Sequence, residues 1–190
     1  MTQARPMRAD ARRNYERLLR AAVEAFAEHG EGASLDDIAK RAGVGSGTLY
    51  RHFPTRRALL EAAYLDRIEA LAQRADAIAR ELPPGEALVE WLNELALGLT
   101  RVRGLKSLLG SAVTDDGSAV ATACGSRLTG AAERLVRAAQ AEGSLRGDVE
   151  PIEVLRLTHG VATASELASG AGTDVRRYLS LLTDGLRAAP

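Results

Sequence analysis

The sequence predicts an all-α protein, and three observations carry that prediction. Apolar residues recur at helical spacing, as at Leu18, Ala22 and Phe26. Sustained β alternation is absent, and aromatic residues make up only 4% of the chain. Prolines at 6, 54, 83, 84, 151 and 190 divide the chain into helix-length segments, because a proline inside a helix costs about 3 kcal/mol.

Local signals place each helix in turn. The first is predicted over about 9–28 and stops at His29-Gly30. The second begins after Ser34, whose hydroxyl can cap it; Asp37 stands where a capping box has its acid, and the helix runs to about residue 42. The third covers about 46–52, and the fourth starts after Pro54-Thr55 and extends to about 82. After the break at Pro83-Pro84-Gly85, helices are expected at about 86–102, 105–113, 118–142, 152–169 and 174–188.

Residues 34–53 have the pattern of a helix-turn-helix. Gly43 lies where the chain must reverse, and glycine tolerates the positive φ that such turns require. Val44 and Leu49 can fill the angle between the two helices, and Phe53 follows Leu49 by four residues on the same inner face. The inner face of the first helix of the motif consists of Leu35, Ile38, Ala39 and Ala42.

The remaining residues of the third helix point outward and suit contact with DNA: Ser46, Gly47, Thr48, Tyr50, Arg51 and His52. The absent side chain at Gly47 lets the helix backbone approach DNA closely. Thr48 can contact phosphate or a thymine methyl, and Arg51 can reach a guanine edge or a phosphate. Tyr50 and His52 can hydrogen-bond phosphates, and Arg56, in the next helix, can reach a phosphate too.

The net charge of zero hides an asymmetry between the two parts of the chain. Residues 1–60 hold 11 Lys+Arg and 7 Asp+Glu, a balance of +4, and residues 61–190 hold 14 and 18, a balance of −4. A basic N-terminal part suits contact with phosphates, although chance scatter of surface charge would give the same numbers.

Residues 10–64 resemble the DNA-binding domain of the tetracycline-repressor (TetR/AcrR) family of bacterial regulators, a likeness that covers about a third of the chain. Two positions depart from the family pattern. Gly45 replaces the usual capping serine, so either Gly45 or Ser46 caps the third helix. Arg57 replaces an acid, and we expect it to be solvated rather than to contact phosphate. The residues that carry the resemblance are Leu19, Ala21-Ala22, Phe26, His29-Gly30, Ser34, Ile38-Ala39, Ala42-Gly43-Val44, Gly47-Thr48-Leu49-Tyr50, His52-Phe53, Leu59-Leu60 and Tyr64.

The resemblance implies two domains. The first is a DNA-binding domain over 1–66, in which Ser34 and Gly45 are further candidate DNA-contacting residues. The second is a helical domain over 67–190 that binds a small molecule and dimerises. Small residues in the last two helices suit a close dimer interface, with internal packing as the alternative: Gly160, Ala162, Ala164, Ala168 and Gly170. Candidate pocket residues, each of which can equally be plain core, are Trp91, Leu95, Leu99, Leu105, Leu109, Val113 and His159.

Other chemistries find little support in the sequence. The three histidines lack metal-ligand spacing, no catalytic motif is present, and Asp115-Asp116 is interpreted as loop and helix cap, so we expect neither enzyme activity nor a metal or cofactor. The lone Cys124 and the absence of a signal peptide or membrane-spanning run predict a cytoplasmic protein. The sequence therefore predicts a homodimeric regulator, more specifically a repressor released from a palindromic DNA operator by a small molecule. The alternative is a helical small-molecule- or protein-binding module whose helix-turn-helix does not act on DNA.

Overall fold

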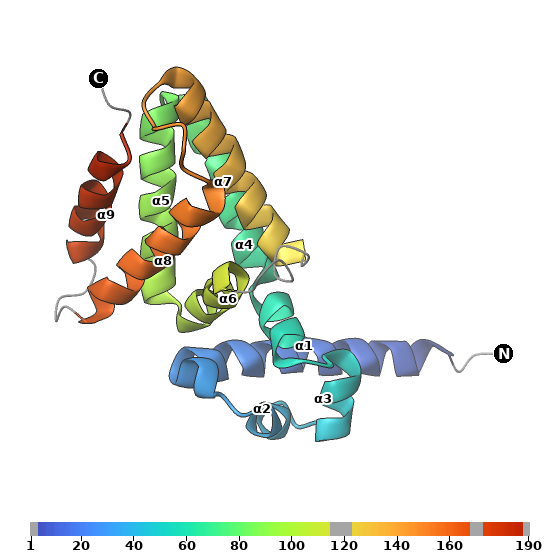
Figure 1. The fold of residues 1–190 in the computed structure, drawn as a ribbon. Helices are drawn as coiled ribbons and strands as arrows, with labels where there is room; N and C mark the ends of the chain where they lie inside the picture. The colour runs from blue at the N-terminus through green and yellow to red at the C-terminus, as the bar shows by residue number, and fades with distance from the viewer. Residues whose placement is uncertain (1–3, 115–122, 168–172, 188–190) are drawn as a thin grey trace. The chain divides into compact units, whose positions relative to one another are not determined.

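The computed structural model describes residues 4–114, 123–167 and 173–187, and nine α-helices occupy most of these ranges (Figure 1). Within them the only β pairing is an isolated bridge between Leu145 and Arg187, so the all-α prediction is confirmed. The chain divides into two compact units, Met1–Leu65 and Asp66–Pro190. No helix in the described ranges is both long and apolar enough to cross a membrane.

The first unit contains α1 (Ala4–His29), a 3-10 turn (Gly30–Gly32), α2 (Leu35–Arg41), α3 (Ser46–His52) and the start of α4 (Arg56–Glu81). Its core is formed by fully buried side chains from every helix, among them Leu18, Phe26, Ile38, Leu49 and Leu59. Helix α1 begins about five residues before its predicted start. Pro6 permits this because it stands in the first turn, where its missing N–H would have no partner within the helix.

The second unit contains the rest of α4 together with α5 (Pro84–Arg101), α6 (Arg103–Thr114), α7 (Ala123–Glu142), α8 (Pro151–Leu167) and α9 (Thr173–Gly185). The first residues of α5 and α8 are Pro84 and Pro151, so both helices start slightly earlier than predicted. Proline is favoured at this position because its φ is already helical. The predicted segments 118–122 and 168–169, residue 188 and Asp115-Asp116 lie outside the described residues.

Helix α5 is the centre of the second unit and packs against α6, α7, α8 and α9 (Figure 1). Leu92 and Leu95 are fully buried, and each such burial stabilises the fold by about 1.5–3 kcal/mol. Trp91 is also fully buried, and its indole N–H donates to the Leu71 carbonyl of α4 at 3.0 Å. That bond satisfies the one polar atom of the indole and ties α5 to α4.

Candidate nucleic-acid interface

Helix α2 starts where the sequence predicts. Ser34 has extended backbone angles, and its hydroxyl accepts a hydrogen bond from the Asp37 N–H at 3.3 Å. Asp36 and Asp37 both lie in the first turn, where negative charge is favourable to the helix dipole. These features confirm the predicted cap at Ser34; a DNA contact by this residue stays a prediction.

The turn between α2 and α3 is a Schellman motif. The Val44 N–H donates to the Ala39 carbonyl at 3.0 Å, and the Gly43 N–H donates to the Lys40 carbonyl at 3.0 Å. Gly43 has a φ of +66°, as predicted, and this conformation is costly for residues with a side chain. The turn therefore fixes the path of the chain into α3.

Helix α3 is capped by Gly45, which resolves the choice between Gly45 and Ser46. The Gly45 carbonyl accepts from the Thr48 N–H at 2.8 Å and from the Leu49 N–H at 3.2 Å. Leu49 and Phe53 are buried, as predicted for the inner face. The opposite face is therefore presented away from the core of the unit.

The outer face of α3 combines exposed and half-buried groups. Tyr50 has 47% of its surface exposed, and its hydroxyl makes no hydrogen bond to the described residues. Gly47 is exposed, and a Cβ added to it would meet no atom within 4 Å. Ser46 and Thr48 are half-buried at the edges of this face. Packing within the unit thus gives no reason for a glycine at 47.

Arg51 folds back along α3. Its Nε donates to the Gly47 carbonyl at 3.2 Å, and its Nη2 donates to the Thr48 hydroxyl at 3.1 Å. Both partners lie one helical turn away, a spacing at which side chains on a helix meet. Two predicted DNA-contacting residues, Thr48 and Arg51, are therefore linked to each other in the free protein.

His52 is less exposed than predicted, because it packs against α1. Its ring lies 5.9 Å from that of Tyr15 in an edge-to-face arrangement, and the Tyr15 ring lies 5.2 Å from that of Phe53. Sequence reasoning missed Tyr15. The available signal was its position three residues before Leu18, at the edge of the apolar stripe of α1.

Two arginines in the first turn of α4 have partners that were not predicted. The Arg56 guanidinium donates from Nη2 to the Ala33 carbonyl, and its Nη1 is buried with no hydrogen-bond partner. Arg57 is paired with Glu61 at 3.0 Å, one helical turn along, so the expectation of a merely solvated Arg57 is wrong. A phosphate contact by Arg56 stays a prediction, and its guanidinium already links α4 to the residue before Ser34.

A bidentate ion pair holds α2 against α1. Arg41 donates to the two carboxylate oxygens of Glu28 at 2.9 and 2.8 Å. These bonds lower the pKa of Glu28 and raise that of Arg41, although both side chains are exposed. The pair therefore braces the first helix of the motif against α1.

The predicted pocket residues lie on helices of the larger unit that pack against one another, α5, α6 and α8. Trp91, Leu95, Leu99, Leu105 and Leu109 are buried in the core. His159 is half-buried against α6, with its Nε2 3.1 Å from the place a Cβ on Gly110 would take. The side chains of Val113 and Cys124 lie outside the described ones. Ligand contact by these residues stays a prediction.

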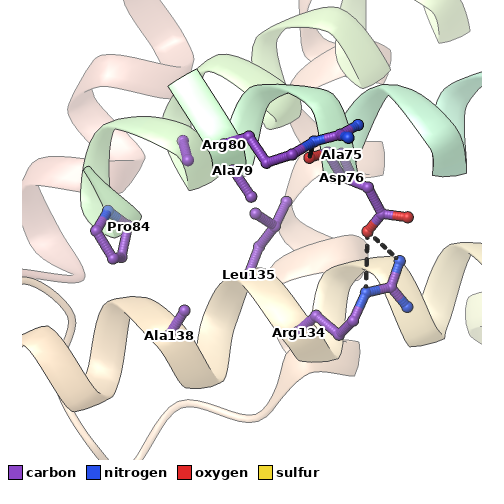
Figure 2. Close-up of a pocket in the computed structure, with 9 residues that line it drawn as sticks. Ala75, Asp76, Ala79, Arg80, Pro84, Arg134, Leu135 and Ala138 are labelled. Carbon is purple, nitrogen blue, oxygen red and sulfur yellow. Dashed lines mark hydrogen bonds and ion pairs between the residues drawn. The ribbon is translucent and has the colours of Figure 1, made fainter. Parts of the chain in front are cut away.

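A groove that sequence reasoning missed runs between α4 and α7 (Figure 2). It has a volume of about 530 Å³. An ion pair between Asp76 and Arg134, at 2.8 Å, bridges the two helices at its edge (Figure 2). Its walls owe their depth to small side chains on both helices, Ala75, Ala79 and Ala138 among them.

Helices α8 and α9 expose apolar side chains. Leu157 and Leu167 of α8 are 42% and 84% exposed, and Leu181 of α9 is 62% exposed. Gly160 and Ala164 are also exposed and, with Leu157 and Leu167, follow a 3–4–3 spacing along one side of α8. Ala162 points into the core instead, and Ala168 and Gly170 lie outside the described residues.

Two family models together match most of the chain. Residues 18–63 match the model described as "Bacterial regulatory proteins, tetR family". Residues 83–188 match "Transcriptional regulator SbtR-like, C-terminal domain". The first covers the helix-turn-helix, and the second covers α5 to α9.

Individual proteins similar to this chain are also TetR-family or helix-turn-helix transcriptional regulators. The solved TetR transcriptional regulator SCO0520 from Streptomyces coelicolor is 36% identical, with 93% of this chain and 99% of that one covered and a TM-score of 0.58. The regulator UidR of Escherichia coli is 37% identical over 95 residues, which are 50% of this chain and 46% of UidR. The match thus spans less than half the length of that curated relative. At the level of fold alone, FadR from Thermus thermophilus, a TetR-family repressor solved with lauroyl-CoA, is 24% identical, with 93% and 97% coverage and a TM-score of 0.63.

Proposed function

The chain belongs to the TetR family of bacterial transcriptional regulators, and from that premise we propose that it is a homodimeric repressor whose α3 helices contact a near-palindromic DNA operator and whose release is controlled by a small molecule. The outer face of α3 carries this proposal. It combines an exposed tyrosine, an exposed arginine and a glycine that no packing contact requires. Such a surface suits insertion into the major groove, where a close backbone approach is needed.

Each residue of this face has a distinct proposed role. Tyr50 and His52 bind phosphates and set the position of the helix. Thr48 and Arg51 exchange their mutual hydrogen bond for bonds to DNA, and Ser46 contacts bases at the start of the helix. The proposed DNA-contacting residues also include three that lie outside α3, where backbone or side-chain donors can face phosphates: Ser34, Gly45 and Arg56.

The exposed stripe on α8 supports the proposed dimer. Gly160 and Ala164 allow close approach of a second helix, while Leu157 and Leu167 supply apolar area to bury. Leu181 of α9 is a further exposed apolar side chain that a dimer through both helices would bury. A twofold dimer formed there would present two α3 helices, which a palindromic operator with half-sites about 34 Å apart requires.

The small-molecule part of the proposal rests on the family fold. The solved structure of FadR from Thermus thermophilus contains lauroyl-CoA, a bound small molecule in the same fold. In this chain, the core between α5, α6 and α8 contains the candidate contact residues whose side chains are described, with His159 as the polar group. A ligand that binds one dimer geometry better than the other would shift the dimer toward or away from DNA.

Gel-shift assays on promoter fragments of its own and neighbouring genes test the proposal. We expect a specific shift that weakens as salt rises, because phosphate contacts release counterions. Tyr50→Phe is expected to weaken binding to all sequences similarly, whereas Thr48→Ala is expected to alter the preferred sequence as well. The absence of any specific shift at low salt would count against DNA recognition by this chain.

A further inference from the structure

A second groove lies on the larger unit, between α4 and α5. We refer to it as the α4–α5 groove. Its volume is about 420 Å³, within the range of small-molecule sites. Leu71 of α4 and Leu97 of α5 are part of its lining, and each is half-buried.

The charges in the α4–α5 groove are unbalanced. Three arginines and one carboxylate line it: Arg67, Arg74, Arg101 and Glu94. Arg74 donates from Nε to both oxygens of Glu94, at 2.9 and 3.2 Å, and this contact raises the pKa of Arg74. Arg67 and Arg101 have no ion pair or hydrogen bond among the described residues. Two unpaired arginines, both with exposed side chains, therefore line one groove.

Local helix electrostatics explain only one of these two arginines. Arg101 lies in the last turn of α5, where a cation interacts favourably with the exposed carbonyls. Arg67 lies in the interior of α4, in the second unit, more than two turns from either end of that helix. Both side chains are exposed, so water and salt screen the repulsion between them in the free protein, and an anion in the groove can contact both.

We propose that the α4–α5 groove is a binding site for a small organic anion, whose carboxylate or phosphate is held by Arg67 and Arg101 and whose apolar part lies on Leu71 and Leu97. The guanidinium group suits this role because it presents paired N–H donors that match the oxygens of either anion. The site is separate from the candidate core residues, and binding to it does not depend on operator recognition.

Isothermal titration calorimetry on the full chain tests the site with three probes of similar size: benzoate, phenyl phosphate and benzyl alcohol. We expect one or both anions to bind, more weakly as salt rises, and the uncharged alcohol not to bind. Stronger binding of benzoate assigns a carboxylate ligand, and stronger binding of phenyl phosphate assigns a phosphate ester.

Three variants locate the binding. Arg67→Ala/Arg101→Ala removes both unpaired arginines and is expected to weaken anion binding by about tenfold or more. Ala70→Glu adds a carboxylate at an exposed position lining the groove and is expected to weaken it similarly, even if the double variant folds poorly. Arg80→Ala removes an exposed arginine of α4 outside the groove and is the matched control, with affinity expected to stay within about twofold.

Three results would overturn the proposal. The first is no binding of either anion, and the second is equal binding of benzyl alcohol. The third is unchanged anion binding in Arg67→Ala/Arg101→Ala with a lowered Tm, which would assign these arginines to the stability of the fold. Because no DNA enters the experiment, each result is independent of the proposed operator binding.

Discussion

Two glycines in helices of different units have opposite surroundings. A Cβ added to Gly85, in α5 of the larger unit, would lie 2.5 Å from the hydroxyl oxygen of Ser144 and 2.8 Å from the Cβ of Ser144. A Cβ added to Gly47, in α3 of the first unit, would meet no atom within 4 Å. Gly110 of the larger unit is similarly close to His159, at 3.1 Å. Packing inside the chain therefore explains Gly85 and Gly110. The glycine of α3 lacks such an explanation, which is expected where the contact is made with a partner outside the chain.

The largest effect on stability is expected at Gly85. Gly85→Ala forces a methyl group against Ser144, and overpacking of this kind costs about 1–3 kcal/mol. Urea unfolding followed by circular dichroism measures the loss. Adding Ser144→Gly should recover most of it, and a Gly85→Ala variant as stable as the parent would show that the α5–α7 junction adapts freely.

Gly43 tests a different requirement within the first unit, that of backbone conformation. Its φ of +66° predicts that Gly43→Ala lowers the free energy of unfolding by about 1–2 kcal/mol. Gly43→Asn is the matched control, because asparagine tolerates this conformation better, and should cost less. Thermal unfolding of both variants measures the difference; equal losses would assign the cost to the added side chain rather than to φ.

Gly47→Ala tests whether Gly47 is required by a partner outside the chain, because we expect it to raise stability and to lower operator affinity. Gly47 is the second residue of α3, and alanine loses less backbone entropy than glycine in a helix, so stability is expected to rise by at most about 0.5–1 kcal/mol. Operator affinity is expected to fall by about tenfold, or 1.4 kcal/mol, because the methyl group occupies space needed by DNA. Thermal unfolding and fluorescence anisotropy measure the two quantities; unchanged affinity would mean that α3 does not approach DNA at Gly47.

The smallest effect is expected from the exposed pair of Glu28 and Arg41. Arg41 lowers the pKa of Glu28 in the folded state, so the pair stabilises the fold above the ordinary glutamate pKa of about 4.3. This stability is lost as pH falls through the lowered pKa. Unfolding of the parent and Glu28→Gln across acidic pH should show a difference at neutral pH that disappears in acid, and a difference independent of pH would exclude this carboxylate as its source.

Local signals made much of the helix-turn-helix predictable. The cap at Ser34, the positive φ at Gly43 and the burial of Leu49 and Phe53 all depend on residues within a few positions of one another. The pairing of Arg57 with Glu61 follows the same i, i+4 rule and could have been found.

Contacts between distant segments were not predictable in the same way. Tyr15 packs on His52 across 37 positions of sequence, and Arg56 bonds to the carbonyl of Ala33, a group that every residue carries. The α4–α5 groove likewise depends on the alignment of two helices, which brings Arg67 and Arg101 into one cavity. Helical periodicity assigns a residue to a face but does not assign that face its neighbour.

Enrichment of bound duplexes from a randomised DNA pool tests most directly whether α3 of a twofold dimer recognises DNA. We expect a near-palindromic site with half-sites 10–10.5 base pairs apart, and a changed half-site sequence for Thr48→Ala. Enrichment of no sequence over the starting pool would contradict DNA recognition by α3. Enrichment of a single, unrepeated element would contradict the twofold dimer, and an identical half-site for the parent and Thr48→Ala would contradict base contact by Thr48.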